Sequence, residues 1–227
     1  MKIYNHSLEE ALKKIKDREV QVTVVGNGTV GLPLSTFFAQ NGFSVIAYDI
    51  NSERVSDINS AKVVFEYSAI LREVVQKKLL KATTNSAEAF ANADFIQICV
   101  PTPIDENKQI NLSHLKKASY EISRTMKPGS VIIDLAASSG RNCELTQNGK
   151  TIVVNGVQIV GKSDYPAQMP SDASKMFGCN IINLLKIMID KEGKLNLNMQ
   201  DDIINGTTAV HGKEYISRRV RQMLNIQ

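Results

Sequence analysis

A glycine-rich turn at residues 26–31 constrains the fold of this 227-residue chain more than any other feature. The turn reads Gly-Asn-Gly-Thr-Val-Gly, and the β-branched run before it, at residues 20–25, predicts a buried parallel strand. The apolar pattern at residues 29–40 predicts a helix directly after it. A strand, a glycine-rich turn and a helix in this order are typical of an α/β fold that binds a dinucleotide.

The three glycines at this spacing each have a separate task in such a site. Gly26 permits a tight turn, Gly28 lets a pyrophosphate approach the backbone, and Gly31 lets the helix pack close to the strand. The start of the helix also presents free N–H groups and a partial positive charge to the diphosphate. A glycine-rich turn without a ligand is the alternative, and the flanking strand and helix favour dinucleotide binding.

An acidic residue lies where such a site needs one. Asp49 ends the next predicted strand, about twenty residues beyond the turn, where a carboxylate accepts hydrogen bonds from the ribose hydroxyls. A hydrogen bond to a charged group contributes about 1.5–3 kcal/mol, and the same carboxylate would repel a 2′-phosphate. We therefore expect NAD rather than NADP. Asn51, Ser52 and Arg54 would soften this preference, unless they only form the solvated start of a helix.

Strand and helix patterns alternate from residue 20 to about residue 140. This alternation predicts a Rossmann-type α/β fold with a doubly wound parallel sheet. The expected strands are residues 20–25, 44–49, 95–100 and 131–135, and the expected helices are residues 29–40, 52–59, 68–78, 86–92 and 111–126.

The pattern changes on either side of this region. A capped amphipathic helix begins at Ser7, with Glu10 at the capping-box position. Asn155-Gly156 lies between two alternating apolar runs and predicts a β-hairpin with a type I′ turn, and an amphipathic helix follows at residues 171–190. We expect an N-terminal helix (residues 1–19), an NAD-binding Rossmann domain (residues 20–140) and a C-terminal segment with a hairpin-plus-helix extension (residues 141–227).

Two further strand ends complete the predicted cofactor site. The Val-Pro-Thr-Pro sequence at residues 100–103 ends the strand that neighbours the first in the usual doubly wound order, although prolines that simply end a strand are the alternative. Residues 136–140 end the next strand, near the expected position of a nicotinamide. The predicted cofactor-binding residues are Gly26, Asn27, Gly28, Thr29, Val30, Gly31, Asp49, Ile50, Val100, Pro101, Thr102 and Ala136.

One motif suggests a different kind of nucleotide site. Residues 156–163, Gly-Val-Gln-Ile-Val-Gly-Lys-Ser, match the phosphate-binding loop of nucleoside triphosphatases. Such a loop has to follow a strand and open a helix, with its middle residues free to surround phosphates. Here the middle residues alternate as the second arm of the hairpin, so we expect no triphosphate site.

Composition and scattered reactive residues exclude several function classes. The net charge of +4 arises from interspersed charges and gives little support for nucleic-acid binding. Three cysteines without paired spacing argue for a reducing compartment, and the longest apolar stretch, residues 181–189, is too short for membrane insertion. The first residues lack the apolar core of a signal peptide, so we expect a cytoplasmic protein.

Neither a metal site nor a catalytic residue can be assigned from the sequence. His6, His114 and His211 are far apart, and their spacing to the cysteines matches no metal-ligand pattern. Cys143 is a candidate nucleophile, or a lone buried thiol. The catalytic residues therefore stay unknown.

Three motifs in the first half carry a family resemblance. They are residues 26–34 (Gly-Asn-Gly-Thr-Val-Gly-Leu-Pro-Leu), 48–51 (Tyr-Asp-Ile-Asn) and 100–103. With them, the region from residue 22 to residue 103 resembles the NAD-binding N-terminal domain of the UDP-glucose/GDP-mannose dehydrogenase family. The resemblance implies that Gly26, Gly28, Gly31, Asp49 and Thr102 contact the cofactor, and that a sugar nucleotide is the ancestral substrate.

The second half resembles a different family. From residue 126 onward the chain is similar to the NAD(H)-binding alpha component of NAD(P) transhydrogenase, in the alanine dehydrogenase/transhydrogenase group. The matching stretches are residues 134–137, 142–146, 155–161, 180–185 and 201–207. The two resemblances together imply a hybrid of two homologous cofactor folds, natural or engineered.

Neither family's catalytic set is complete. The sugar dehydrogenases use a cysteine in a glycine-rich segment together with lysine, asparagine and aspartate residues, and nothing after Gly140 matches them. The catalytic carboxylate of the alanine dehydrogenases would fall at Ser138, and Arg141 replaces a glycine of the same loop. Two functions therefore remain open: an NAD-dependent oxidoreductase, and a non-catalytic NAD-binding module.

The resemblance also bears on oligomeric state. In the transhydrogenase group the hairpin and the helix pack on a partner subdomain, which the resemblance implies is missing here. The apolar face that they would expose predicts a homodimer.

Overall fold

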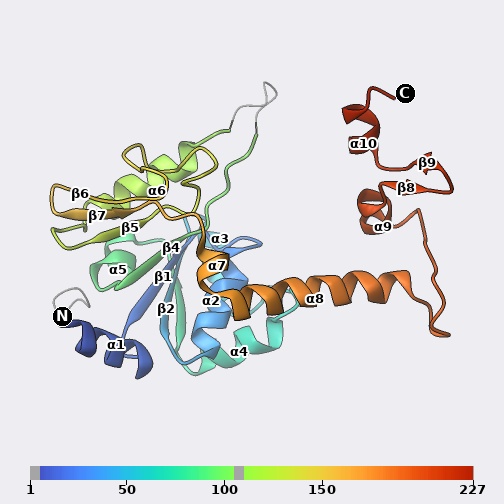
Figure 1. The fold of residues 1–227 in the computed structure, drawn as a ribbon. Coiled ribbons are helices and arrows are strands. Elements are labelled where there is room, and N and C mark those ends of the chain that lie inside the picture. The colour runs from blue at the N-terminus through green and yellow to red at the C-terminus, as the bar shows by residue number, and fades with distance from the viewer. Residues whose placement is uncertain (1–5, 105–109, 227) are drawn as a thin grey trace. The chain divides into compact units, whose positions relative to one another are not determined.

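The computed structural model describes residues 6–104 and 110–226 (Figure 1). The chain divides into two compact units, Met1–Asp134 with Asn142–Gly161, and Leu135–Arg141 with Lys162–Gln227. The first unit contains both the glycine-rich turn and the predicted hairpin. The domain boundary at residue 140 stays a prediction.

A parallel four-stranded sheet forms the centre of the first unit. Its order is β3-β2-β1-β4, with all neighbours parallel, as in the first half of a Rossmann fold. The strands are β1 (Gln21–Val25), β2 (Ser44–Tyr48), β3 (Leu80–Thr83) and β4 (Phe95–Ile98). The connecting helices are α2 (Gly31–Gln40), α3 (Ser52–Asn59), α4 (Ser68–Gln76), α5 (Ser86–Ala91) and α6 (Ser113–Ser123). The predicted α/β Rossmann-type fold is confirmed.

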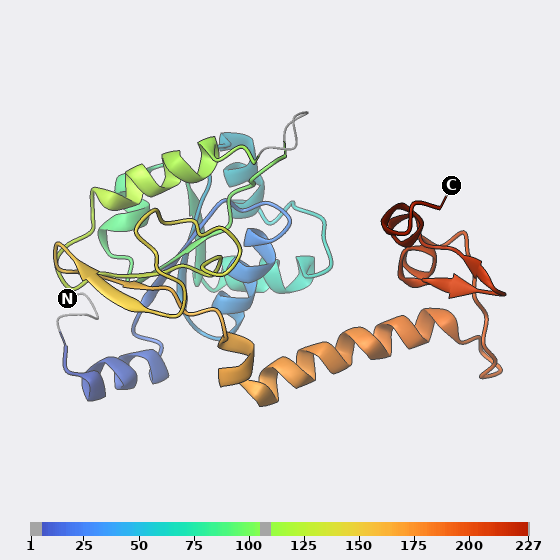
Figure 2. The ribbon, with the colours of Figure 1, turned by 45° about the horizontal axis from the view of Figure 1, so that its top comes forward.

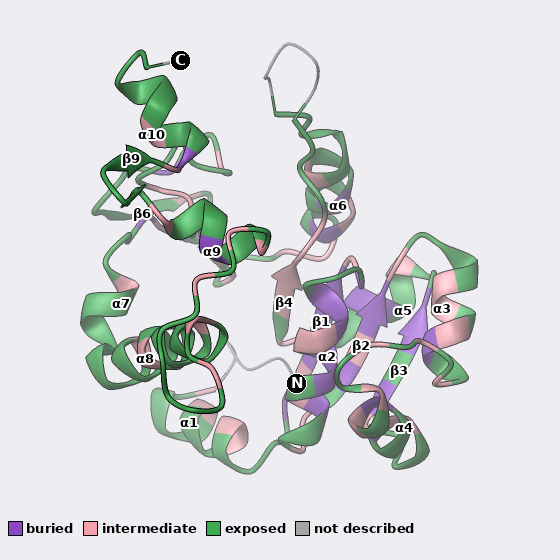
Figure 3. Cartoon of the chain, turned by 90° about the vertical axis from the view of Figure 1, so that its right-hand side faces the viewer, coloured by how far each residue is buried: buried purple, intermediate pink, exposed green. Residues whose placement is uncertain are grey.

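The core lies on both faces of this sheet, because successive side chains of a strand point to opposite sides. Val24 belongs to the core cluster that includes Leu32 of α2 and Leu71 of α4. Its neighbour Val25 belongs to a second cluster, with Phe90 of α5. Figure 3 shows the buried residues concentrated on β1, β2 and β3 and on α2. A sheet covered on both faces explains why every residue of β1 after Gln21 is buried, Thr23 included.

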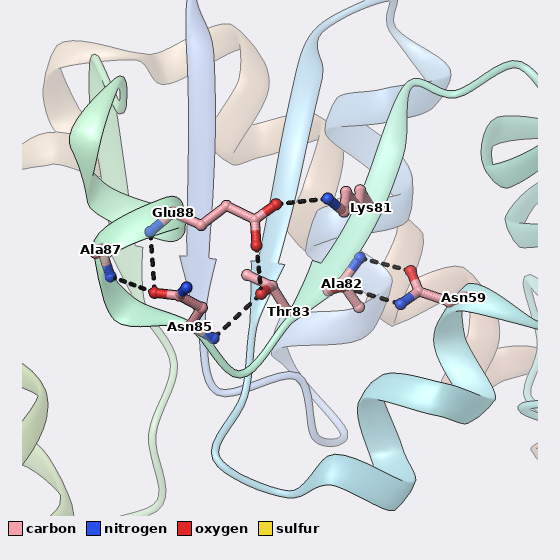
Figure 4. Close-up of polar contacts among 7 residues, drawn as sticks. All are labelled: Asn59, Lys81, Ala82, Thr83, Asn85, Ala87 and Glu88. Carbon is pink, nitrogen blue, oxygen red and sulfur yellow. Dashed lines mark hydrogen bonds and ion pairs between the residues drawn. The ribbon is translucent and has the colours of Figure 1, made fainter.

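The edge strand β3 was not expected from the sequence. It has only four residues, and Lys81 interrupts its apolar character. Its outer edge is closed by Asn59 of α3, whose amide group accepts from the N–H of Ala82 at 2.8 Å and donates to the carbonyl of Ala82 at 2.9 Å (Figure 4). Glu88 accepts from Thr83 at 2.7 Å and pairs with Lys81, and the hydrogen bond from Lys81 lowers the pKa of this carboxyl. The two hydrogen bonds of Asn59 satisfy backbone groups of Ala82 at a strand edge that would otherwise be free.

The predicted hairpin is present and forms a second sheet. β6 (Thr151–Val154) and β7 (Val157–Val160) are antiparallel, and the turn residues Asn155 and Gly156 have φ angles of +50° and +77°. β5 (Val131–Ile133) pairs in parallel with β7. We expected β5 to extend the doubly wound sheet, but within the described residues no ladder joins it to β4. The hairpin arm provides the parallel partner instead.

The first helix and the second unit complete the chain. α1 (Leu8–Lys16) has the predicted capping box between Ser7 and Glu10. The second unit contains α7 (Tyr165–Gln168), α8 (Pro170–Met188), α9 (Asp202–Thr207), β8 (Val210–His211), β9 (Glu214–Tyr215) and α10 (Arg218–Met223). Figure 2 shows α8 as one unbroken helix, and none of its residues is buried. Among the described residues, no helix combines the length and apolar character that a membrane span requires.

Candidate cofactor site

The glycine-rich turn connects β1 to α2 with little space between them. Gly26 has a φ of +85°, which favours glycine, and a Cβ atom there would lie 3.0 Å from the carbonyl oxygen of Cys99. A Cβ atom on Gly31 would lie only 1.9 Å from the carbonyl oxygen of Gly26. A Cβ atom on Gly28, by contrast, would have no heavy atom within 4 Å. The first and third glycines therefore allow close packing, and the middle one faces open space.

The residues between Gly28 and the start of α2 have backbone N–H groups that no acceptor uses among the described residues. The N–H of Leu32 donates to the carbonyl of Gly28 at 3.2 Å, which marks the first turn of the helix. Within residues 6–104 and 110–226, the N–H groups of Thr29 and Val30 have no acceptor, and both residues are exposed. Free N–H groups at a helix N-terminus, together with the positive end of the helix dipole, attract an anion.

Asp49 lies directly beside the turn. One of its carboxylate oxygens accepts from the N–H of Asn27 at 2.7 Å, and the other accepts from the N–H of Asn51 at 3.0 Å. The carbonyl of Asn27 accepts from Nε of Arg54 at 2.9 Å. Asp49 is only half-buried, so its oxygens keep lone pairs for a further donor. The carboxylate and the turn are thus joined into one site.

The other predicted cofactor residues lie at different distances from the turn. The end of β4 touches it, because a Cβ atom on Gly26 would lie 3.2 Å from Cα of Val100. Ile50 follows Asp49 and is exposed, and Pro101 and Thr102 are exposed beyond β4. Ala136 belongs to the second compact unit. The structure therefore brings together residues 26–31, Asp49 and Val100.

The loop after β5 is organised by a buried aspartate that the sequence did not single out for this role. Asp134 is 3% exposed, and one of its oxygens accepts from the N–H groups of Asn142 and Cys143, both at 2.9 Å. The same oxygen accepts from the hydroxyl of Thr146 at 2.8 Å. Three donors around one buried carboxylate satisfy its charge and fix the course of this loop.

The phosphate-loop sequence at residues 156–163 does not form a phosphate-binding loop. Residues 157–160 form strand β7, which pairs with β6 on one side and β5 on the other. The N–H of Gln158 donates to the carbonyl of Ser130 at 2.9 Å, and the N–H of Gly161 donates to Lys150 at 2.8 Å. Backbone donors that serve a sheet are not available to phosphates, so the interpretation as a hairpin arm is confirmed.

The side chain of Cys99 lies close to the turn, since a Cβ atom on Gly31 would lie 3.3 Å from its Cβ atom. Burial raises the pKa of the Cys99 thiol, which disfavours the reactive thiolate. In the part of the chain that the structure describes, no three histidine, cysteine, aspartate or glutamate residues are grouped so that they could hold a metal ion. The turn and the Asp49 carboxylate are suited to holding a dinucleotide.

Comparison with known proteins identifies this unit. Residues 20–154 match the sequence model described as UDP-glucose/GDP-mannose dehydrogenase family, NAD binding domain. The chain belongs to this family. The match confirms NAD(H) as the cofactor predicted from the glycine-rich turn.

The relatives come from two groups of enzymes. The chain is 29% identical over 211 residues to NAD(P) transhydrogenase subunit alpha of Haemophilus influenzae, covering 86% of this chain and 39% of that protein. It is 31% identical over 130 residues to UDP-N-acetyl-D-mannosamine dehydrogenase of Methanococcus maripaludis, covering 54% and 30%. A solved UDP-D-ManNAc dehydrogenase from Pyrococcus horikoshii is 31% identical, with a TM-score of 0.47 over 50% of this chain and 28% of that one. Both predicted resemblances are confirmed, and the chain spans two fifths or less of each of these relatives.

Proposed function

We propose that the chain is an NAD(H)-binding unit of oxidoreductase ancestry, in which residues 26–31 hold the pyrophosphate and Asp49 holds the adenosine ribose. The observation that carries this proposal is the open space at Gly28, beside N–H groups that have no acceptor among the described residues. A pyrophosphate needs such donors and such room. The turn is rigid on both sides of this space, because Gly26 and Gly31 are tightly packed.

Each part of the site contributes a different interaction in this proposal. The N–H groups of Thr29 and Val30 donate to the pyrophosphate, and the Asp49 carboxylate accepts from the ribose hydroxyls. Val100 and Thr102, at the end of β4, contact the cofactor toward its nicotinamide half. When bound, NAD(H) supplies hydride transfer at its nicotinamide ring, and the protein provides binding and orientation.

Two outcomes for catalysis follow from the same site. As an enzyme, the chain would transfer hydride between nicotinamide and a substrate, and the related UDP-N-acetyl-D-mannosamine dehydrogenase suggests a sugar nucleotide. As a non-catalytic module, or as a hybrid without a complete active site, it would bind the cofactor alone. The incomplete catalytic sets of the two related families, with Ser138 and Arg141 at positions of the alanine dehydrogenase loop, favour the module. Formation of NADH from NAD and UDP-sugars would decide for the enzyme.

Calorimetric titration with NAD, NADH, NADP and ATP tests the binding proposal. We expect NAD and NADH to bind, and NADP to bind at least about ten times more weakly, because Asp49 repels the 2′-phosphate. ATP should not compete with NAD at comparable concentrations. Binding of ATP without binding of NAD would contradict the proposal.

We further propose that the chain acts as a homodimer in a reducing, cytoplasmic environment. The three cysteines are free, which agrees with such a compartment. Helix α8 exposes large apolar side chains, with Met176 71% and Phe177 67% exposed. A second copy is the occupant that we assign to this apolar face, because symmetric pairing covers the same face on both chains.

Charge placed on this face should separate the two copies. We expect Phe177→Glu to weaken the dimer at least tenfold in sedimentation equilibrium, since burying a charge at an apolar contact is costly. Lys175→Glu is the matched control, because residue 175 lies on the opposite, polar side of the helix. A strictly monomeric unmodified chain at micromolar concentration would disprove the dimer.

A further inference from the structure

The side chain of Asn27 points into the protein and not toward the proposed cofactor. The residue is fully buried, and its amide nitrogen donates to the carbonyls of Val24 and Tyr48, both at 3.0 Å. Its amide oxygen accepts from the hydroxyl of Ser35 in α2 at 2.7 Å, and Ser35 is buried as well. The Asn27 amide therefore links β1, β2 and α2 at the point where the three elements meet the turn.

The backbone of the same residue supports the groups that face the adenosine end. The N–H of Asn27 donates to Asp49 at 2.7 Å, and its carbonyl accepts from Arg54 at 2.9 Å. The orientation of the Asn27 peptide groups thus sets where the carboxylate and the guanidinium lie. Both peptide groups are anchored by the buried side chain between them.

We infer that Asn27 and Ser35 are positioning residues for recognition of the ribose 2′-hydroxyl by Asp49. This inference rests on the proposed binding of NAD through the turn and Asp49. The buried amide has its hydrogen bonds satisfied only while Ser35 donates to it. Without that donor the Asn27 backbone can adopt more conformations. The Asp49 carboxylate then loses the fixed orientation with which it accepts a hydrogen bond from the ribose 2′-hydroxyl.

A pair of substitutions in α2 separates this role from general packing. Ser35→Ala removes the donor to Asn27. Thr36→Val removes the adjacent buried hydroxyl, which donates to the carbonyl of Leu32 in its own helix at 2.8 Å. Both variants are titrated with NAD and with 2′-deoxy-NAD, in which the adenosine ribose lacks its 2′-hydroxyl. Their thermal midpoints are measured without ligand. Ser35→Cys, with a weaker donor of similar size, serves as a conservative variant.

The ratio of the two affinities is the decisive readout. We expect the unmodified chain to prefer NAD over 2′-deoxy-NAD by about tenfold or more, because the hydroxyl donates to a carboxylate. Ser35→Ala should reduce this preference about three- to fivefold, and Ser35→Cys should reduce it less. Thr36→Val should leave the preference unchanged, even if Ser35→Ala and Thr36→Val both have lower thermal midpoints than the unmodified chain.

An unchanged preference in Ser35→Ala would overturn the inference while the proposed function stands. Equal binding of the two ligands by the unmodified chain would also overturn it, since Asp49 would then not recognise the hydroxyl. An unmodified chain that binds neither ligand would instead refute the proposed function itself, and the inference with it. In an Asp49→Ala background, Ser35→Ala should cause no further loss of preference.

Discussion

Substituting alanine for Gly31 is expected to lower the free energy of unfolding by about 3 kcal/mol or more. The new Cβ atom would lie 1.9 Å from the carbonyl oxygen of Gly26 and 2.9 Å from its carbonyl carbon. Both are backbone atoms of the turn, so no side-chain rotation can relieve the contact. α2 would have to move away from β1, and buried contacts such as those of Leu32 would be lost. Urea denaturation followed by circular dichroism measures the change.

The control for this substitution lies within the same turn. Gly28→Ala places a methyl group where no heavy atom lies within 4 Å, so we expect a change in stability of no more than about 0.5 kcal/mol. The same methyl group would occupy the space assigned to the pyrophosphate, so NAD affinity should fall. If Gly31→Ala were as stable as the unmodified chain, the close packing of the turn on α2 would be wrong.

Much of the first unit could be predicted because its local signals agree with its packing. β1, β2 and β4 are apolar runs that end at glycine, aspartate or proline, and each was placed within about two residues. The hairpin was predictable from Asn155-Gly156 between two alternating apolar runs, since Asn-Gly favours the positive φ angles of a tight two-residue turn. For these segments the local pattern of apolar and turn residues was sufficient to predict the position of the strand or turn.

The segments that were missed depend on distant partners. β3 is a four-residue strand with an exposed lysine, and it is stabilised by the side chain of Asn59, which belongs to helix α3. The pairing of β5 with β7 depends on a hairpin that begins well beyond β5 in the chain. A local pattern carries no information about such partners, so propensity alone could not assign them.

In the candidate site, too, local features could be predicted from the sequence and contacts between distant residues could not. The spacing of the glycines specified where a ligand has room, and Asp49 followed from the strand that precedes it. The spacing does not specify which way the side chain between the first two glycines points. Asn27 is among the predicted cofactor-binding residues, and this stays a prediction; its amide is buried, and its backbone N–H and carbonyl bond to Asp49 and Arg54. The partner Ser35 is eight residues away, and only the packing of α2 brings it close.

Asp49→Ala is expected to weaken NAD binding about 10- to 100-fold and NADP binding much less. In the proposed site the carboxylate accepts hydrogen bonds from the ribose hydroxyls of NAD, and it would repel the 2′-phosphate of NADP. Part of the loss will be common to both cofactors, because Asp49 also holds the N–H groups of Asn27 and Asn51 at 2.7 and 3.0 Å. The ratio of the two affinities removes this common part, and we expect it to fall to about one.

Asp49→Asn separates charge from shape in the same measurement. The amide keeps one acceptor oxygen for the turn but carries no negative charge. We therefore expect NADP affinity to rise relative to NAD in Asp49→Asn, with a smaller loss of stability than in Asp49→Ala, as followed by thermal denaturation. Equal losses of NAD and NADP affinity in both variants would mean that Asp49 only supports the turn. The ribose would then have to be recognised by other groups, and the preference for NAD would need a different physical origin.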